Sequence, residues 1–335
     1  MKRFFAITLA TLIAVTSLIT GCKCSGSKEG NNDYKPSITG DAGEVLIVLN
    51  KQLWESELGA TLREVLGGEY PYLPQREAYF RLYNTSDKDF SGNFTIFRNI
   101  VKVNISPDYK ESGISIKKDV WARPQCVVSI KGASAAQVMT HILENRELIL
   151  NTIEQAERDR LISGYKKYED PKVREAVTKN IGGSPYFPKG FTMKKNTPDF
   201  MWISQETTYV NQGILIFKVP YTDQSQLEDE NIISQLKDLW QANVPGMREN
   251  SYMTFNELIE PGIKKISYKG ENMIEVRGLW EVANDFMGGP MICHIFPDLE
   301  KKNLIFVNGF VYAPKYDKRK YLRNVESIIF SFFWK

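Results

Sequence analysis

The chain has 335 residues, of which 25% are charged and 12% aromatic, and its formal net charge at pH 7 is +3. This composition indicates a globular protein and excludes an intrinsically disordered chain. So small a net charge gives no long-range attraction to nucleic acid, and we expect no nucleic-acid partner.

Residues 1–21 have the layout of a bacterial signal peptide. Two positive residues at 2–3 precede an apolar run at 4–19, and small residues lead to Cys22. The run is shorter than the roughly 20 residues that span a bilayer, which favours a cleaved secretory signal over a membrane anchor. The segment also resembles a lipoprotein signal. That resemblance implies cleavage before Cys22, a thioether-linked diacylglycerol on its sulfur, and acylation of its new amine, for example by palmitate. An uncleaved anchor and a secretory cleavage without lipid stay open as alternatives.

The residues after Cys22 predict a tether and a location. Residues 22–43 are rich in Gly, Ser, Asn, Lys and Pro, and a flexible tether of about 21 residues reaches roughly 25 Å. Lys23 stands where an aspartate would favour retention in the inner membrane, so we expect the outer membrane. Lysines interrupt the few acids that follow, which favours the periplasmic face over the cell surface. The expected partners are the membrane, through the lipid on Cys22, and a periplasmic protein or envelope component of unknown identity.

The first predicted domain, residues 44–181, combines strands with helices. A compact apolar strand at 45–49 precedes an amphipathic helix that ends at Gly67-Gly68. Further strands are predicted at 77–82, 93–98, 100–105 and 125–130. Ser134 begins a helical pattern through a capping box, and the pattern continues to about residue 168. Asp170-Pro171 predicts the start of another short helix.

The second predicted domain, residues 182–335, begins at a Gly- and Pro-rich stretch over 182–190. Its strands are predicted at 190–195, 199–206, 213–219, 263–269, 272–283, 290–297 and 303–312. Gly288-Gly289 predicts a hairpin turn, Ser225 a helix start, and Asp317 the cap of a final helix that packs on the sheet. The fold class is therefore α+β, with mostly antiparallel sheets, covering helices and two similar-sized segments. A duplicated module stays open.

Four runs of the chain together indicate a resemblance to a known family. They are Lys118–Gln125, Ala156–Ile162, Gly278–Val282 with Asp285–Pro290, and Tyr312–Arg319. With them, the chain from about Gly40 to its end resembles a Bacteroidota lipoprotein family described only as a domain of unknown function. The resemblance implies no activity and no catalytic residues.

The usual catalytic and metal-binding motifs are missing from the sequence, so we predict no catalytic residues, no metal and no cofactor. His141 and His294 both lie in apolar surroundings, which favours structural roles. Cys293 and His294 cannot act as a dyad, because adjacent strand residues point to opposite faces. Cys126 and Cys293 lie in strand-like runs and are expected to be buried free thiols. A disulfide between them stays open.

Two clusters are candidates for binding. Lys318, Arg319, Lys320 and Arg323 lie at the start of the final helix, where free N–H groups favour an anion. Asp317 and nearby acids could instead neutralise these cations. Separately, Asp119, Trp121 and Arg123 alternate along one side of an extended segment. Trp and Arg are favoured at interfaces, although the same residues could seal a domain junction.

These observations favour a lipid-anchored envelope protein that binds or scaffolds without catalysing a reaction. The alternative is a carboxylate-dependent hydrolase of envelope glycans or lipids, in which Glu275, Glu281 and Asp285 approach one another. Against it, Glu275, Arg277 and Glu281 alternate with apolar residues, which predicts an ordinary solvent-exposed sheet face. Acids clustered in a cleft would favour the hydrolase.

Overall fold

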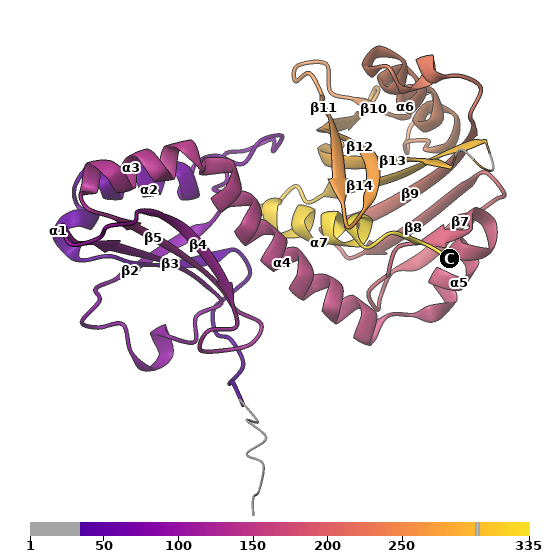
Figure 1. Cartoon of the computed structure of the whole chain (residues 1–335). Helices are drawn as coiled ribbons and strands as arrows, with labels where there is room; N and C mark the ends of the chain where they lie inside the picture. Colours follow the sequence, from indigo (N-terminus) through magenta and orange to yellow (C-terminus); the bar gives the residue numbers. More distant parts are fainter. Residues whose placement is uncertain (1–33, 299, 301) are drawn as a thin grey trace, which may run out of the picture. The chain divides into compact units, whose positions relative to one another are not determined.

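The computed structural model describes residues 34–298, 300 and 302–335 (Figure 1). Cys22, the predicted signal peptide and the predicted tether up to residue 33 lie outside the described residues. Within the described part, no helix combines the length and the apolar character needed to cross a membrane.

The first sheet has five strands in the order β2-β1-β3-β5-β4. The strands are β1 (Glu44–Val48), β2 (Arg81–Thr85), β3 (Asn99–Ile105), β4 (Gly113–Lys118) and β5 (Cys126–Gly132). β1 pairs in parallel with both β2 and β3, β3 pairs in parallel with β5, and only β4 is antiparallel. All five residues of β1 are buried, as expected of a parallel strand that is covered on both faces.

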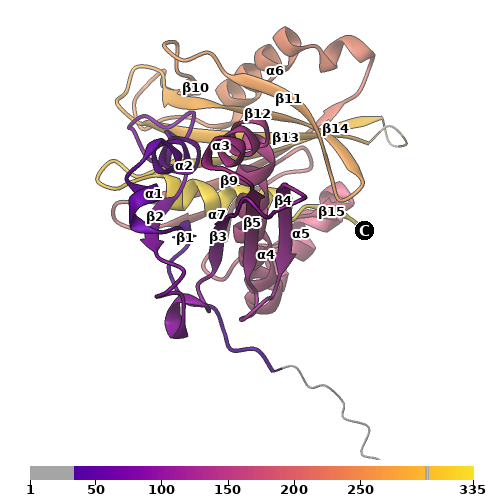
Figure 2. The ribbon, with the colours of Figure 1, turned by 60° about the vertical axis from the view of Figure 1, so that its left-hand side comes forward.

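Helices cover one face of the first sheet (Figure 2). They are α1 (Lys51–Trp54), α2 (Glu57–Gly67), α3 (Ala135–Glu144) and the first half of α4 (Arg146–Tyr168). The apolar side chains of β1, β3 and β5 pack against Leu62 of α2, Val138 of α3 and Ile149 of α4. The second half of α4 contributes Ile162 and Tyr165 to a different core. One long helix therefore belongs to the packing of both sheets.

The second sheet has eight strands, and all of its pairings are antiparallel. In the order β10-β12-β13-β14-β9-β8-β7, with β11 beside β12, they are β10 (Met253–Phe255), β12 (Glu271–Val282), β13 (Gly288–Asp298), β14 (Asn303–Tyr312), β9 (Asn211–Pro220), β8 (Phe200–Glu206), β7 (Thr192–Asn196) and β11 (Gly262–Tyr268). A separate ribbon pairs β6 (Gly183–Ser184) with β15 (Phe333–Trp334).

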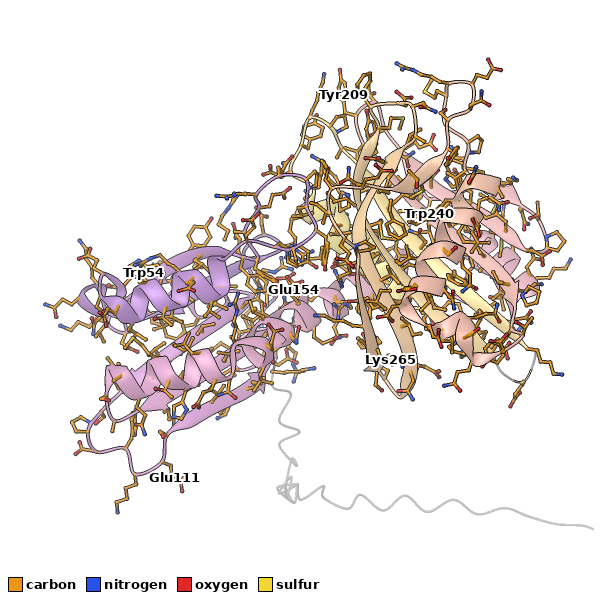
Figure 3. The ribbon with its side chains drawn as sticks, turned by 90° about the horizontal axis from the view of Figure 1, so that it is seen from above. Trp54, Glu111, Glu154, Tyr209, Trp240 and Lys265 are labelled. Atoms are coloured by element: carbon orange, nitrogen blue, oxygen red, sulfur yellow. The ribbon has the colours of Figure 1, made fainter. Side chains whose placement is uncertain are left out.

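Two helices bury the two faces of the second sheet. α6 (Asp229–Asn243) follows a 3-10 turn at Gln224–Leu227 and places Trp240 in the core of one face (Figure 3). α7 (Arg319–Phe330) packs on the other face. A Cβ at Gly309 of β14 would lie 2.8 Å from Ile329 of α7, so the glycine allows this close approach. Because both faces are covered, β13 and β14 are buried along most of their length.

Most predicted elements are confirmed, and the mostly antiparallel α+β class is correct. The exceptions are local. The predicted strand at 93–98 is instead a 3-10 turn at Gly92–Phe94, and β4 was not predicted. The strand predicted at 77–82 overlaps β2 only at its last two residues, and the helix predicted to start at Ser225 begins at Asp229, after a 3-10 turn. Gly288 and Gly289 lie within β13 rather than in a turn. The two sheets also differ in strand order and direction, so the topology gives no support to a duplicated module.

The structure places the end of the predicted tether and the predicted boundary between the two domains. Of the predicted tether, Ser37 bridges to Arg123 and Thr39 bridges to Phe97, so this part lies against the first sheet. The predicted boundary at Gly182 falls at the end of α5 (Pro171–Ile181). The apolar side chains of α5 pack in the core of the second sheet, together with those of α7.

Candidate functional site

A group of charged side chains is buried between α4, α7 and the β12-β13 pair. We call it the buried charge cluster, and Figure 3 marks its α4 member, Glu154. Its members are Tyr70, Glu154, Glu275, Arg277, His294, Arg319, Arg323 and Glu326. Three carboxylates and three guanidinium groups thus lie together, and their formal charges cancel.

α7 supplies three members from one face, because Arg319, Arg323 and Glu326 are spaced by four and three residues. Arg319 Nη2 lies 2.6 Å from Glu154 Oε1, and its Nη1 lies 3.3 Å from Glu326 Oε2. Arg323 Nη2 donates to the same Glu154 oxygen at 3.1 Å. Arg319 therefore links the two carboxylates, and its guanidinium also stacks over the Tyr70 ring at 3.5 Å.

β12 supplies the opposite side of the cluster through Glu275 and Arg277, which share a face at a spacing of two residues. Arg277 contacts Glu275 at 2.6 Å and Glu326 at 2.5 Å. The Tyr70 hydroxyl accepts from Arg277 at 2.7 Å and donates to Glu326 at 2.8 Å. The prediction of a solvent-exposed face for Glu275 is wrong, because this residue is 7% exposed. The alternating pattern is that of an exposed face, but α4 and α7 cover it.

The arginines keep the carboxylates ionised. Burial alone would raise the pKa of Glu326, but Arg319 and Arg277 lower it to about 2. Burial acts in the same way on Glu154, and Arg319 and Arg323 lower its pKa below the ordinary value. For Glu275, too, burial is outweighed, and Arg277 lowers the pKa. Burial raises the pKa of the Tyr70 hydroxyl, so this group stays protonated.

The cluster borders a cavity of about 300 Å³ whose lining includes Glu154, Glu275, Arg277 and Glu326. Within the cluster, each of these carboxylates already accepts hydrogen bonds from arginine. A glycosidase-type acid needs a carboxyl group with a raised pKa, and these carboxylates have lowered ones. The arrangement can hold a polar group by charge and hydrogen bonding, and the lowered pKa values disfavour Glu154, Glu275 and Glu326 as general acids.

Glu275 lies too far from Glu281 to form a glycosidase pair with it. Glu275 and Glu281 are six residues apart on the continuous strand β12, which separates them by about 20 Å. Glycosidase carboxylates lie roughly 5–10 Å apart. Glu281 accepts from Asn256 at 2.5 Å, and Asp285 pairs with Arg248 at 3.7 Å.

The histidines and cysteines lie in structural positions. His294 is fully buried, its Nε2 lies 3.1 Å from Glu275 Oε2, and burial lowers its pKa despite that contact. His141 is half-buried on α3. Cys126 and Cys293 are buried free thiols, as predicted. Among the described residues, no group of three His, Cys, Asp or Glu side chains could hold a metal ion.

The predicted anion site at the start of α7 contains an anion from the chain itself. The backbone N–H groups of Lys318 and Arg319 donate to the two oxygens of Glu77 at 2.7 and 2.8 Å. Asp317 was predicted to cap the helix, but the N-cap residue is Lys318, and its side chain makes no capping hydrogen bond. Glu77 accepts from the first N–H groups instead. Lys318 is buried and donates to Gln75, whereas Lys320 is exposed. Together with the ion pairs of Arg319 and Arg323, this gives three of the four predicted cations partners within the chain. The binding of an external anion stays a prediction.

The predicted interface residues lie beside the start of the described chain. Asp119 accepts from the Gln125 backbone at 2.9 Å and lies 3.6 Å from Arg123. Trp121 is 37% exposed and packs edge-on against Phe90 at 5.2 Å. The Arg123 backbone N–H donates to the carbonyl of Pro36. The three residues therefore share one segment with partial exposure, and their role in an interface stays a prediction.

Sequence reasoning missed Tyr70, Glu154 and Glu326. No local pattern marks Glu154, whose partners lie more than 160 residues away on α7. For Glu326 the sequence did contain a signal. It lies on the same face of α7 as Arg319 and Arg323, and that face also carries apolar residues of the buried stripe. A second buried acid on α4, Glu157, pairs with Arg98 at 2.6 Å and Arg160 at 3.1 Å.

Two family models match the chain, and both describe a Domain of unknown function. One (DUF8532) matches residues 38–166, and the other (DUF4837) matches residues 170–331. The expected resemblance to a family of unknown function is confirmed, while the match does not show the Bacteroidota lineage. No curated protein matches the chain. Among solved structures, the human StarD13 (DLC2) lipid transfer and protein localization domain is similar over 48% of this chain and 93% of that chain. Its identity is 12% and its TM-score 0.23, which is too low to indicate a shared fold.

Proposed function

We propose that this chain, which carries two domains of unknown function, is a lipid-anchored envelope protein that binds a partner without catalysing a reaction. In this proposal the lipid on Cys22 attaches it to the outer membrane, with the body on the periplasmic side. The order of a positive start, a short apolar run and small residues before Cys22 supports the anchor. Two or three acyl chains would make the attachment stable, since one chain alone binds reversibly.

The observation that carries the non-enzymatic part is the state of the buried carboxylates. Glu154 and Glu326 lie at the cavity, but arginines lower the pKa of both. General acid catalysis on a glycan needs a carboxyl group whose pKa is raised. A buried, charge-balanced cluster instead supports a structural role that holds α4, α7 and β12 together, and leaves the surface for binding.

The anchor is tested with Cys22→Ala, for which Cys24→Ala is a matched control two residues away. We expect radiolabelled palmitate to enter the wild type and the Cys24→Ala variant but not Cys22→Ala. We also expect Cys22→Ala to be lost from carbonate-washed outer membranes. Palmitate incorporation and membrane retention that survive Cys22→Ala would defeat the anchor.

The binding part is tested by crosslinking in living cells, with photoreactive residues placed on the folded body. Specific adducts with one envelope component are expected. The hydrolase alternative predicts turnover of envelope glycans or lipids by the purified chain, with loss of turnover in Glu281→Gln. Such turnover would overturn the non-enzymatic proposal.

A further inference from the structure

A second cavity, of about 280 Å³, lies where the end of α7 meets the β11-β12 hairpin and the second half of α4. We call it the aromatic pocket. Its lining includes three buried apolar side chains, Ile162, Met273 and Ile329. Cavities of about 150 Å³ already admit a benzene ring, so the aromatic pocket has room for a six-membered ring with substituents. None of its lining residues belongs to the buried charge cluster.

Aromatic rings form the walls of the aromatic pocket and hold one another in place. Phe296 and Phe332 are stacked at 4.4 Å, and Trp334 packs edge-on against Phe332 at 5.0 Å. On the other side, Tyr268 packs edge-on against Phe330 at 4.9 Å. These contacts fix the rings before any ligand binds. Fixed aromatic faces favour a ligand that is itself a flat or nearly flat ring.

The rim of the aromatic pocket carries charges of both signs. Lys166, Lys269 and Glu271 line it and are exposed. Lys269 also lies 3.7 Å from Asp159, so two lysines at the rim are matched by two carboxylates. Arg158 adds a guanidinium behind the wall, over the Phe330 ring. A balanced rim gives no advantage to a charged ligand. A lysine ammonium can only donate hydrogen bonds, and an ionised glutamate can only accept them. A neutral ligand that satisfies both must carry groups that donate and accept, which hydroxyl groups do.

We propose that the aromatic pocket binds a neutral saccharide ring. A pyranose combines an apolar face of C–H bonds, which packs on the aromatic rings, with hydroxyl groups around its edge. Those hydroxyls reach the rim, where Lys166 and Glu271 supply the donor and the acceptor. The assignment rests on the proposed binding function and gives its partner a chemical class, the glycans of the envelope.

The test uses the purified full-length protein in detergent and a set of methyl pyranosides: glucoside, galactoside, mannoside and N-acetylglucosaminide. Binding is measured by saturation-transfer NMR and by titration of the indole N–H signals. Cyclohexanol serves as a neutral ring with a single hydroxyl, and benzoate as an anionic ring. We expect at least one pyranoside to bind more tightly than both comparison compounds.

Substitutions of its lining residues test whether the pyranosides bind in the aromatic pocket. Trp334→Ala should weaken pyranoside binding about tenfold, and Trp334→Phe should restore most of it. Removing both polar partners with Lys166→Ala and Glu271→Ala should cost about tenfold. Lys167→Ala is the matched control, because Lys167 is the next residue of α4 but lies over Tyr168 and does not line the aromatic pocket. It should bind as the wild type does.

Several outcomes would overturn the assignment. One is that none of the pyranosides binds, another is that benzoate or cyclohexanol binds better, and a third is that Trp334→Ala folds normally and binds sugars unchanged. The result is independent of the anchor, because palmitate labelling of Cys22 is a separate readout. If the protein cleaves a bound saccharide, the site stands and the non-enzymatic function fails.

Discussion

Arg319→Met removes the cation that links Glu154 to Glu326, while the methionine keeps part of the apolar stem. In the wild type, Arg319 lies 2.6 Å from one carboxylate, 3.3 Å from the other and 3.5 Å above the Tyr70 ring. Without it, two buried carboxylates lose their shared partner in surroundings where water cannot replace it.

The expected loss of folding stability depends on the ion pairs that Glu154 and Glu326 keep. Breaking a buried ion pair by removing one partner costs about 3–5 kcal/mol. Glu154 keeps Arg323 at 3.1 Å, and Glu326 keeps Arg277 at 2.5 Å. We therefore expect a loss at the lower end of that range, about 3 kcal/mol, which lowers the melting temperature by roughly 5 °C for a folded body of this size.

The assay is urea and thermal unfolding at pH 7, followed by circular dichroism. Lys320→Met is the matched control, because Lys320 is the next residue of α7 but is exposed, and its change should stay within about 0.5 kcal/mol. Combining Arg319→Met with Glu154→Gln should cost at least about 1 kcal/mol less than the sum of the two single changes. A loss below about 1 kcal/mol for Arg319→Met, or strict additivity with Glu154→Gln, would refute the reasoning.

Three further predictions concern Glu326, Glu77 and the two buried cysteines. The pKa of Glu326 is lowered in the folded state to about 2, so its contribution is present above its ordinary pKa near 4.5 and is lost as pH falls toward 2. Glu326 alone should account for roughly 3 kcal/mol of the stability that urea unfolding loses over that window. Glu154 and Glu275, whose pKa values are also lowered, add to this loss, and Glu326→Gln should make the slope shallower. Glu77→Gln removes the charge that accepts from the first N–H groups of α7 and should cost about 1 kcal/mol in thermal unfolding, whereas no change would exclude Glu77 as the cap. Cys126 and Cys293 are buried, and burial raises the pKa of both thiols, that of Cys126 to about 11. Both should therefore resist maleimide in the native state and react only in urea, and rapid native labelling would contradict their burial.

The local elements of the fold could be predicted because they depend on local patterns. Asp170 followed by Pro171 fixes the start of α5, and the apolar stripe of α7 fixes its buried face. The parallel first sheet was missed although a signal existed, because the continuous apolar run of β1 is typical of parallel strands. β4 has exposed residues at most of its positions and so lacks an apolar pattern.

The buried charge cluster could not be predicted in the same way. Glu275 and Arg277 have the spacing of an exposed strand face, and only the packing of α4 and α7 over that face buries them. The cations of α7 were recognised as an unusual feature, because they lie where the helix dipole opposes them. Their partners, Glu77 and Glu154, come from distant parts of the chain. Local spacing alone does not identify partners at such separations.

The central claim, a protein held at the membrane through Cys22, is tested most directly by the mass of its N-terminal peptide. Protein purified from outer membranes is digested and analysed by mass spectrometry. The proposal predicts a first peptide that begins at Cys22 and carries the added mass of a diacylglycerol and an amide-linked acyl chain. A first peptide that begins at Met1, or a mature peptide with an unmodified Cys22, would contradict it.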